Sequence, residues 1–347
     1  MLNETELFEY VKEGKWDKLD ACLQGETDLD VNLRDELGNF LLSYAVANNK
    51  PQTVELLSKA GARLDIMDDD KPSLLYFPIR FGYLTLVQLL LNLSMDQVGI
   101  PLIDFKDVLG KIPLTYALEK QTLDIVQLLV SSGSNPNIPD RAGNTSVHYA
   151  LLTRKLEFIK ELETGKVKPN WTLANYAGET PLHLAVRMQS VPIVSFLLSK
   201  KVPLDAIDKE EQSTPAHEAL VLNNHPIFKL LLDAGLAPNI QDYYGSTYLH
   251  TCIRNDRIKA FLLLFKLAGT RLKVNLFDAQ GNLPLHLVLS LPWSEHSPLY
   301  LSHLLPWTNL NLQNNKGMSC LHLLLARPEW KDYKSNLLPK KLNLFQK

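Results

Sequence analysis

The chain has 347 residues, of which 46% are hydrophobic and 21% charged, a composition typical of folded proteins and not of disordered ones. The net charge of −2 at pH 7 gives no general attraction for nucleic acid, and three scattered cysteines favour a reducing compartment over a disulfide framework. No apolar run approaches the ~18 residues of a membrane span, and the polar first ten residues hold no signal-peptide core. We therefore expect a protein of the cytoplasm or nucleus without membrane insertion.

Residues 1–34 precede the first copy of a repeated sequence phrase. Within them, Thr5 to Leu23 predicts two short amphipathic helices that are broken at Gly14. The first of these helices is rich in Glu and Lys, which is typical of a capping unit with one solvent-exposed face.

The repeated phrase is clearest over residues 175–185, which read N-Y-A-G-E-T-P-L-H-L-A, and weaker copies recur every 33 to 39 residues. The copies begin at Asp35, Asp68, Asp107, Asp140, Asn175, Asp208, Asp242, Asp278 and Asn314. A period of this size predicts a solenoid, in which each repeat packs only against its neighbours and one domain can extend over the whole chain.

Each copy has the same local chemistry. The pattern Asp-x-x-Gly predicts a tight turn with the glycine at positive φ, and a threonine then caps a short helix that starts with proline, as in Thr180-Pro181 and Thr214-Pro215. The predicted turn glycines are Gly38, Gly110, Gly143, Gly178, Gly245, Gly281 and Gly317. A second short helix follows in each copy, and three of these helices have a proline in their first turn, at Pro51, Pro192 and Pro226.

A turn, a helix, a turn and a helix in about 33 residues, with T-P-L-H-x-A in the first helix, resembles the ankyrin repeat. The resemblance implies an all-α ankyrin-repeat solenoid of stacked helix-turn-helix units with protruding hairpin fingers. We expect one domain over residues 1–347, with a capping helix pair at 1–34, nine repeats at 35–342 and the beginning of a further, truncated repeat at 343–347. Leu342 to Gln346 matches Val274 to Asp278, so we expect the chain to be part of a longer protein.

Three places depart from the period. The copy that begins at Asp208 lacks the turn glycine and has one extra residue, and Asn92 to Pro101 lengthens one connection. Leu291 to Trp307 predicts a long aromatic loop followed by a short second helix.

Six histidines share one register of the phrase: His148, His183, His217, His250, His286 and His322. A metal or catalytic site needs such residues to converge at one point, whereas these are spread one per repeat. The resemblance implies that each imidazole bonds the backbone of the adjoining turn. The sequence also contains no nucleotide-binding or hydrolase motif, and its cysteines are typical of packing residues. We therefore expect no enzyme, no metal and no cofactor.

The resemblance implies that partners bind at the finger tips and at the inner face of the first helices. The positions that follow the small residue of T-P-L-H-x-A mix arginine with apolar residues, and tyrosines lie at two finger tips. The predicted partner-binding residues are Arg80, Phe81, Arg187, Met188, Val221, Leu222, Arg254 and Arg327 on the helices and Tyr176, Tyr243 and Tyr244 on the fingers. The alternative is that these side chains pack against adjacent fingers. The acidic tip at Asp68 to Asp70 is typical of a solvated turn rather than a metal site.

The sequence therefore predicts a protein–protein interaction module, or adaptor, that binds a protein or peptide partner as a monomeric array. The alternative is the targeting arm of a larger enzyme, or of a pathogen or viral effector in the host cytoplasm, whose catalytic domain lies beyond Lys347. Binding of nucleic acid is not expected, because apolar residues dilute the arginines and no basic stripe forms.

Overall fold

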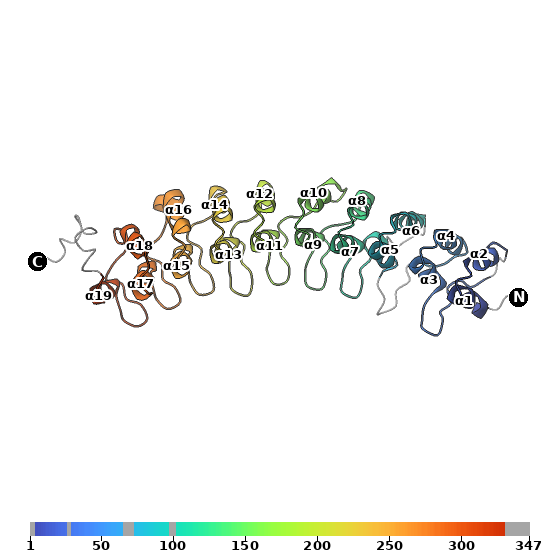
Figure 1. Ribbon diagram of the computed structural model, residues 1–347, viewed down its shortest axis with the longest axis horizontal. Coiled ribbons are helices and arrows are strands. Elements are labelled where there is room, and N and C mark those ends of the chain that lie inside the picture. The colour runs from blue at the N-terminus through green and yellow to red at the C-terminus, as the bar shows by residue number, and fades with distance from the viewer. Residues whose placement is uncertain (1–3, 26–28, 65–72, 97–101, 330–347) are drawn as a thin grey trace, which may run out of the picture. The chain divides into compact units, whose positions relative to one another are not determined.

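The computed structural model describes residues 4–25, 29–64, 73–96 and 102–329 (Figure 1). Its regular elements are all helices, and isolated β-bridges join residues at the bases of three fingers, such as Gln241 and Thr247. The all-α fold of stacked helix pairs is thus confirmed. The chain divides into two compact units, Met1–Tyr176 and Ala177–Lys347.

The first unit begins with the predicted capping pair, in which Gly14 has a φ of +72° at the break. Its helices are α1 (Glu4–Lys12), α2 (Trp16–Gly25), α3 (Leu41–Ala47), α4 (Pro51–Lys59), α5 (Tyr76–Phe81), α6 (Leu84–Asp96), the 3₁₀ turn η1 (Leu102–Asp104), α7 (Pro113–Lys120), α8 (Leu123–Ser132), α9 (Ser146–Leu152) and α10 (Leu156–Thr164). Within this unit the first helices α3, α5, α7 and α9 pack in one row and the second helices α4, α6, α8 and α10 in another (Figure 1).

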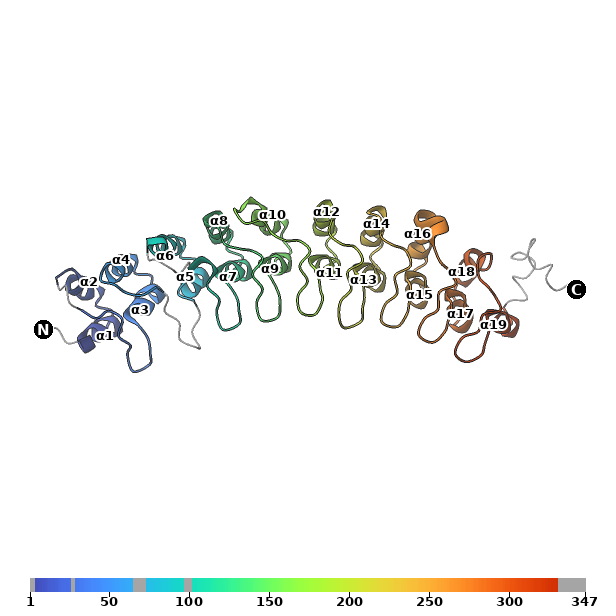
Figure 2. The same cartoon turned by 180° about the vertical axis from the view of Figure 1, so that it is seen from behind.

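The second unit repeats the arrangement. Its helices are α11 (Pro181–Arg187), α12 (Val191–Ser199), α13 (Pro215–Val221), α14 (His225–Asp233), α15 (Tyr248–Arg254), α16 (Ile258–Ala268), the 3₁₀ turn η2 (Gly269–Arg271), α17 (Pro284–Ser290), α18 (Ser297–Leu304) and α19 (Cys320–Ala326). Each first helix from α11 to α17 packs against its own second helix and against the next first helix, and the finger loops extend beyond the row of first helices (Figure 2). The core lies between the rows and combines aliphatic side chains such as Ala185 and Ile193 with fully buried rings such as Phe228 and Phe261, because each short helix turns one apolar stripe inward.

The fingers form for the reason that the sequence indicates. In the finger of residues 140–145, the Asp140 carboxylate accepts the N–H groups of Ala142 and Asn144, both at 2.8 Å, and Gly143 lies at φ +82°. All seven predicted turn glycines have positive φ. In the finger without glycine, Gln212 takes the positive φ, at +48°, one position later after the turn aspartate than the glycines of the other fingers.

An asparagine amide joins the loops that lead into successive fingers. The Asn275 side chain donates to the Trp307 carbonyl at 3.0 Å and accepts the Asn309 N–H at 2.9 Å, so one amide satisfies two backbone groups of the next loop. Asn32, Asn137 and Asn239 bond the loop of the following repeat in the same way. These four amides fix the spacing of neighbouring repeats within each unit.

The irregular regions are partly as predicted. A long loop separates α17 from α18, and α18 is a short second helix, so the expectation for Leu291 to Trp307 is confirmed. The acidic tip at Asp68–Asp70, the end of the long connection at 97–101 and the final segment at 330–347 lie outside the described residues. The prediction of a further repeat that starts at 343 therefore stays a prediction.

Candidate functional site

The finger tips of each unit are held in place by backbone hydrogen bonds between neighbouring fingers. In the second unit, the Tyr243 N–H donates to the Glu211 carbonyl of the preceding finger, and the Ala279 N–H of the following finger donates to the Tyr244 carbonyl, both at 2.8 Å. In the first unit, the Tyr176 N–H donates to the Ala142 carbonyl at 2.9 Å. The three predicted tyrosines therefore project from turns whose backbone is already ordered.

Histidines of the second unit tie each first helix to the next finger, as the resemblance implies. In His183, His217, His250 and His286, Nδ1 accepts the backbone N–H at the start of its own helix and Nε2 donates to a carbonyl at the base of the next finger. The Nε2 distances lie between 2.9 and 3.1 Å. The predicted scaffold role of these four residues is confirmed.

This bonding requires a neutral imidazole. An N–H group points at Nδ1, so a proton on Nδ1 would displace it, and burial further disfavours the charged ring. Burial accordingly lowers the pKa of His217 to about 4, and it lowers the pKa of His183, His250 and His286. These histidines hold the stack together and are not available to a ligand.

Three tyrosines of the first unit bond their own finger instead, and these bonds were not predicted from the sequence. The hydroxyl groups of Tyr44, Tyr116 and Tyr149 each donate to the turn aspartate of their own finger, Asp35, Asp107 and Asp140. The Tyr149 bond is 2.6 Å long, and burial and the aspartate raise the pKa of this tyrosine. The sequence does hold a signal for these bonds, because each tyrosine follows the aspartate that it bonds by nine residues.

We use the name inner-helix surface for the predicted residues of the second unit at the ends of first helices: Arg187, Met188, Val221, Leu222, Arg254 and Arg327. Val221 has an exposed fraction of 55%, and Met188 and Leu222 are half-buried. Exposed and half-exposed apolar side chains thus lie at the ends of the adjacent helices α11 and α13.

Arg187 bridges two carboxylates on this surface. Its guanidinium lies 2.5 Å from Glu179 on the finger of the same repeat and 2.6 Å from Glu218 on α13. The second oxygen of Glu218 is buried and has no hydrogen-bond partner among the described residues. Burial raises the pKa of Glu218, while Arg187 acts against that rise.

The other two arginines of the inner-helix surface also have partners within the chain. Arg254 donates to the Ser246 hydroxyl at 3.1 Å and lies 3.5 Å from the buried Asp278 carboxylate. Arg327 donates to the Leu289 and Leu291 carbonyls, which are among the free carbonyls at the end of α17. Arg327 therefore stabilises a helix end, a role that its position in the sequence did not indicate.

Arg257 has the same role at the end of α13 and was not predicted. Its guanidinium donates to the Leu220 and Val221 carbonyls at 3.1 and 3.0 Å. Its spacing of 36 to 37 residues from these carbonyls is close to one repeat, which is the signal that could have identified it.

The first unit holds the remaining predicted helix residues, Arg80 and Phe81, at the end of α5. Both are exposed, and the Arg80 guanidinium lies 5.8 Å from the Phe81 ring and 6.0 Å from the Tyr76 ring. Phe81 also stacks on Tyr83, at 5.7 Å between ring centroids. This group thus packs within its own repeat, and the binding role of Arg80 and Phe81 stays a prediction.

A small cavity of about 160 Å³ lies beside Arg254. Its walls include Ile253, Val288 and Leu291, and Tyr300 and His296 both bond the Asp256 carboxylate at its edge, at 3.1 and 3.0 Å. Apolar walls with a fixed carboxylate nearby form a shallow recess next to the inner-helix surface.

The described part of the chain has no group of three or more His, Cys, Asp or Glu residues arranged to hold a metal ion. Cys252 and Cys320 are buried and Cys22 is half-buried on α2, and all three are free thiols. No described helix is both long and apolar enough to cross a membrane.

The family model described as "Ankyrin repeats (3 copies)" matches four overlapping segments, residues 42–140, 114–208, 155–242 and 204–278. The chain belongs to the ankyrin-repeat family. A putative ankyrin repeat protein of Acanthamoeba polyphaga mimivirus is 30% identical over 98% of this chain and 47% of its own length. The B-cell lymphoma 3 protein homolog of Mus musculus is 32% identical over 46% of this chain and 36% of its own length.

A solved structure supports the same assignment. The ankyrin repeat domain of Bcl-3, described as a unique member of the IkappaB protein family, is 27% identical, with a TM-score of 0.57 over 68% of this chain and 99% of that chain. A palmitoyltransferase of Homo sapiens is 31% identical over 57% of this chain and 31% of its own length. The chain thus spans less than half the length of each of the three curated relatives named here.

Proposed function

We propose that this ankyrin-repeat chain is a protein-binding module, and that its second unit holds a partner between the tip tyrosines Tyr243 and Tyr244 and the inner-helix surface. The observation that carries the proposal is the state of these two tyrosines. Their exposed fractions are 63% and 52%, and they pack edge to face with ring centroids 5.4 Å apart. Two large, mutually ordered rings on a fixed turn lose little side-chain entropy when they bind.

The inner-helix surface supplies apolar contact. Val221 and Met188 provide area that burial against a partner would remove from water. Because Arg187 and Arg327 already donate within the chain, we assign apolar contact, and not the arginines, the larger share of the affinity.

The test is affinity capture with the whole chain as bait, with captured proteins quantified by mass spectrometry. We expect Tyr243→Ser with Tyr244→Ser to reduce capture of the principal partner by at least about thirtyfold, since aromatic anchors at interface centres contribute about 2 kcal/mol or more. Helical signal and melting temperature should stay at the wild-type values, because both rings are exposed. Unchanged capture would refute the assignment of these tips.

The inner-helix surface needs its own variants. Arg187→Glu is unsuitable, because it would place a third carboxylate beside Glu179 and Glu218 and disturb the fold. Met188→Ser with Val221→Ser removes apolar contact without adding a charge, and Lys229→Ser, an exposed change on the second helix α14, serves as the matched control. We expect the first pair to reduce capture and the control to leave it unchanged.

The alternative proposal is that the array is the targeting arm of a larger enzyme or effector. It is supported by the match to a palmitoyltransferase over a fraction of that enzyme's length, and by the match to a longer viral protein. Reading the open reading frame on both sides of the chain decides this alternative, since a catalytic domain there would support it and its absence would refute it.

A further inference from the structure

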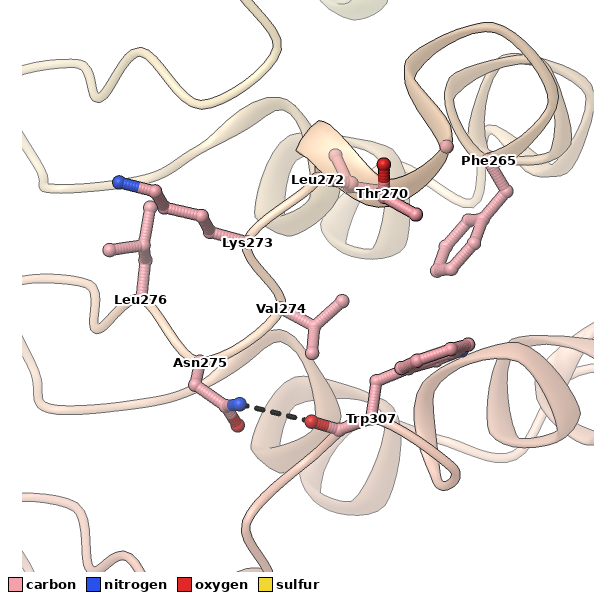
Figure 3. Close-up of a pocket in the computed structure, with 9 residues that line it drawn as sticks. Phe265, Thr270, Leu272, Lys273, Val274, Asn275, Leu276 and Trp307 are labelled. Carbon is pink, nitrogen blue, oxygen red and sulfur yellow. Dashed lines mark hydrogen bonds between the residues drawn. The ribbon is translucent and has the colours of Figure 1, made fainter.

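A cavity of about 610 Å³ lies on the side of the second helices in the second unit, between α16, η2 and the residues after α18 (Figure 3). It shares no lining residue with the inner-helix surface or the tip tyrosines. Its volume falls in the range of about 300–1,000 Å³ that is typical of ligand pockets. The cavity is therefore large enough to receive a substantial group, and it needs an explanation of its own.

The lining is mainly apolar and includes two aromatic rings. Phe265 on α16 and Trp307 point toward the same space, and Val274 projects between them (Figure 3). The exposed fraction of Trp307 is 64%, which is high for the largest apolar side chain. Phe277, with an exposed fraction of 40%, follows the lining residue Leu276 in sequence. A tryptophan exposed to this extent beside a cavity is typical of an interaction site.

The charge at this cavity is of one sign. Lys273 lines it, and Lys266 and Arg271 are exposed neighbours of the lining residues Phe265, Thr270 and Leu272. None of the nine lining residues is acidic, and neither lysine has a carboxylate partner among the described residues. The arrangement is thus complementary to a group that is apolar in its centre and negative at its edge.

The walls are fixed before anything binds. The Asn275 amide bonds the backbone of Trp307 and of Asn309, and the Lys273 N–H donates to Asn239 at 2.8 Å. The backbone of η2 and of the loop that follows is therefore tied to both neighbouring repeats. A pre-ordered cavity loses little entropy on binding.

We propose that this cavity is a second docking site, and that its occupant is an acidic peptide segment of a partner protein. An aromatic or branched apolar side chain of the peptide inserts between Phe265 and Trp307, and a neighbouring carboxylate pairs with Lys273. The mixture of exposed aromatic surface and basic rim favours a peptide, because peptides place apolar and acidic side chains a few ångströms apart.

The first experiment uses a phage-displayed library of random short peptides. The library is depleted on the Trp307→Ala protein and then selected on the wild-type chain. We expect the enriched sequences to pair an aromatic or branched apolar residue with Asp or Glu within a few positions. Enriched sequences without acidic residues, or no enrichment after depletion, would overturn the proposal.

The second experiment measures the affinity of an enriched, fluorescently labelled peptide by polarisation. We expect Trp307→Ala to weaken binding about thirtyfold and Lys273→Glu about threefold, with a smaller salt dependence in the second variant. The matched charge reversal Lys229→Glu, on α14 and distant in sequence from the cavity, should leave the affinity unchanged. Equal effects of Lys273→Glu and Lys229→Glu would contradict the predicted role of the basic rim.

Further controls separate loss of the docking site from unfolding, from self-association and from loss of the inner-helix surface. Lys273 is exposed, so the Lys273→Glu protein keeps its fold and tests the proposal even where Trp307→Ala lowers the melting temperature. Analytical ultracentrifugation of the wild-type chain identifies a competing occupant, since self-association that Trp307→Ala abolishes would assign the cavity to a second copy of the chain and overturn the peptide proposal. Loss of peptide binding in these variants, with partner capture unaffected by them, separates this site from the inner-helix surface.

Discussion

In the first unit, three tyrosines each bond the turn aspartate of their own finger, whereas in the second unit four histidines each bond the backbone of the next finger. The tyrosine bonds stiffen a single repeat, and the histidine bonds couple two. These tyrosines and histidines thus differ in whether they act within one repeat or between two, whereas asparagine amides link successive repeats in both units. We expect the second unit to be the more cooperative of the two.

A second contrast concerns one ion pair. In the first unit Lys111 on a finger pairs with Glu119 at the end of α7, at 2.6 Å, and in the second unit Glu179 pairs with Arg187 at the equivalent positions with the charges exchanged. The cation of each pair also contacts the next repeat: Arg187 pairs with Glu218, and Lys111 lies 5.2 Å from the centroid of the Tyr149 ring. The same geometry therefore serves either sign of charge, and the neighbouring helix decides whether the cation meets a carboxylate or an aromatic ring.

The largest expected effect that separates the units is a response to acid. Because the pKa of His217 is about 4 in the folded chain against an ordinary value of 6.5, the unfolded chain binds a proton between these pH values and the folded chain does not. The stabilisation is therefore complete above pH 6.5 and is lost as the pH falls toward 4, by an amount on the order of 3 kcal/mol for His217 alone.

Hydrogen exchange followed by mass spectrometry, corrected for the intrinsic effect of pH, checks this prediction. We expect α11 to α17 to lose protection between pH 6.5 and 4.5 before α3 to α8 do, since the finger tyrosines of the first unit do not titrate in that window. Simultaneous loss in both units would show that the histidine bonds do not set the acid response.

The next comparison concerns the loss in the free energy of unfolding when a single side chain is removed. His250→Ala leaves the Thr247 N–H and the Asn282 carbonyl without partners in a buried site, so we expect a loss of about 3–4 kcal/mol in the free energy of unfolding. Tyr149→Phe removes one bond to an aspartate that keeps its two backbone donors, and we expect a loss of about 1–2 kcal/mol.

Urea unfolding combined with local hydrogen exchange measures both variants, because a repeat array need not unfold in one step. We expect His250→Ala to raise exchange in both α15 and α17, and Tyr149→Phe to raise it around α9 alone. A local effect of His250→Ala would contradict the proposed coupling between repeats.

The smallest expected difference, between alanine substitutions at two turn glycines, tests a device that both units share. A Cβ at Gly281 would lie 2.5 Å from the Asn315 side chain and 2.7 Å from its backbone nitrogen, whereas a Cβ at Gly317 meets nothing within 4 Å. Their φ angles are +73° and +72°, so strain in the backbone is the same for both. We expect Gly317→Ala to cost about 1 kcal/mol and Gly281→Ala about 2–3 kcal/mol.

Thermal and urea unfolding of the two variants measures this difference. Gly143→Ala in the first unit should behave like Gly281→Ala, because its Cβ would lie 2.6 Å from the backbone nitrogen of Tyr176. Equal costs for Gly281→Ala and Gly317→Ala would show that the close approach of neighbouring fingers does not limit the sequence.

Features that depend on nearby residues were predictable from the sequence. The turn glycines, the capping threonines, the prolines in the first turns of the second helices and the long loop before α18 all lie where the local pattern indicates. The histidines share one register of the phrase, and the resemblance to the ankyrin repeat correctly predicted that they bond the backbone of the adjoining turn. These features follow from backbone chemistry that every copy of the phrase repeats.

Features that depend on side chains of different repeats were not predictable in the same way. Nothing in the sequence near Arg187 indicates that Glu218 lies within reach, and Arg327 follows a helix end without showing that it caps another helix. The cavity beside Trp307 depends on η2, which replaces the simple loops that follow the second helices α12 and α14. Such contacts depend on the rotamer of each side chain at the boundary between repeats, and a single sequence does not specify that rotamer.

The asparagine amide that joins successive loops has a consequence for insertions. The Asn275 side chain makes the same two bonds to the next loop as Asn137 does, although the long loop between α17 and α18 lies within the span that Asn275 closes. The stacking distance of two repeats is therefore set at this amide and is independent of the length of chain between the helices. Added chain length within this loop would consequently leave the register of the array unchanged, whereas Leu291 and His296 at its two ends must be kept, because they bond Arg327 and Asp256.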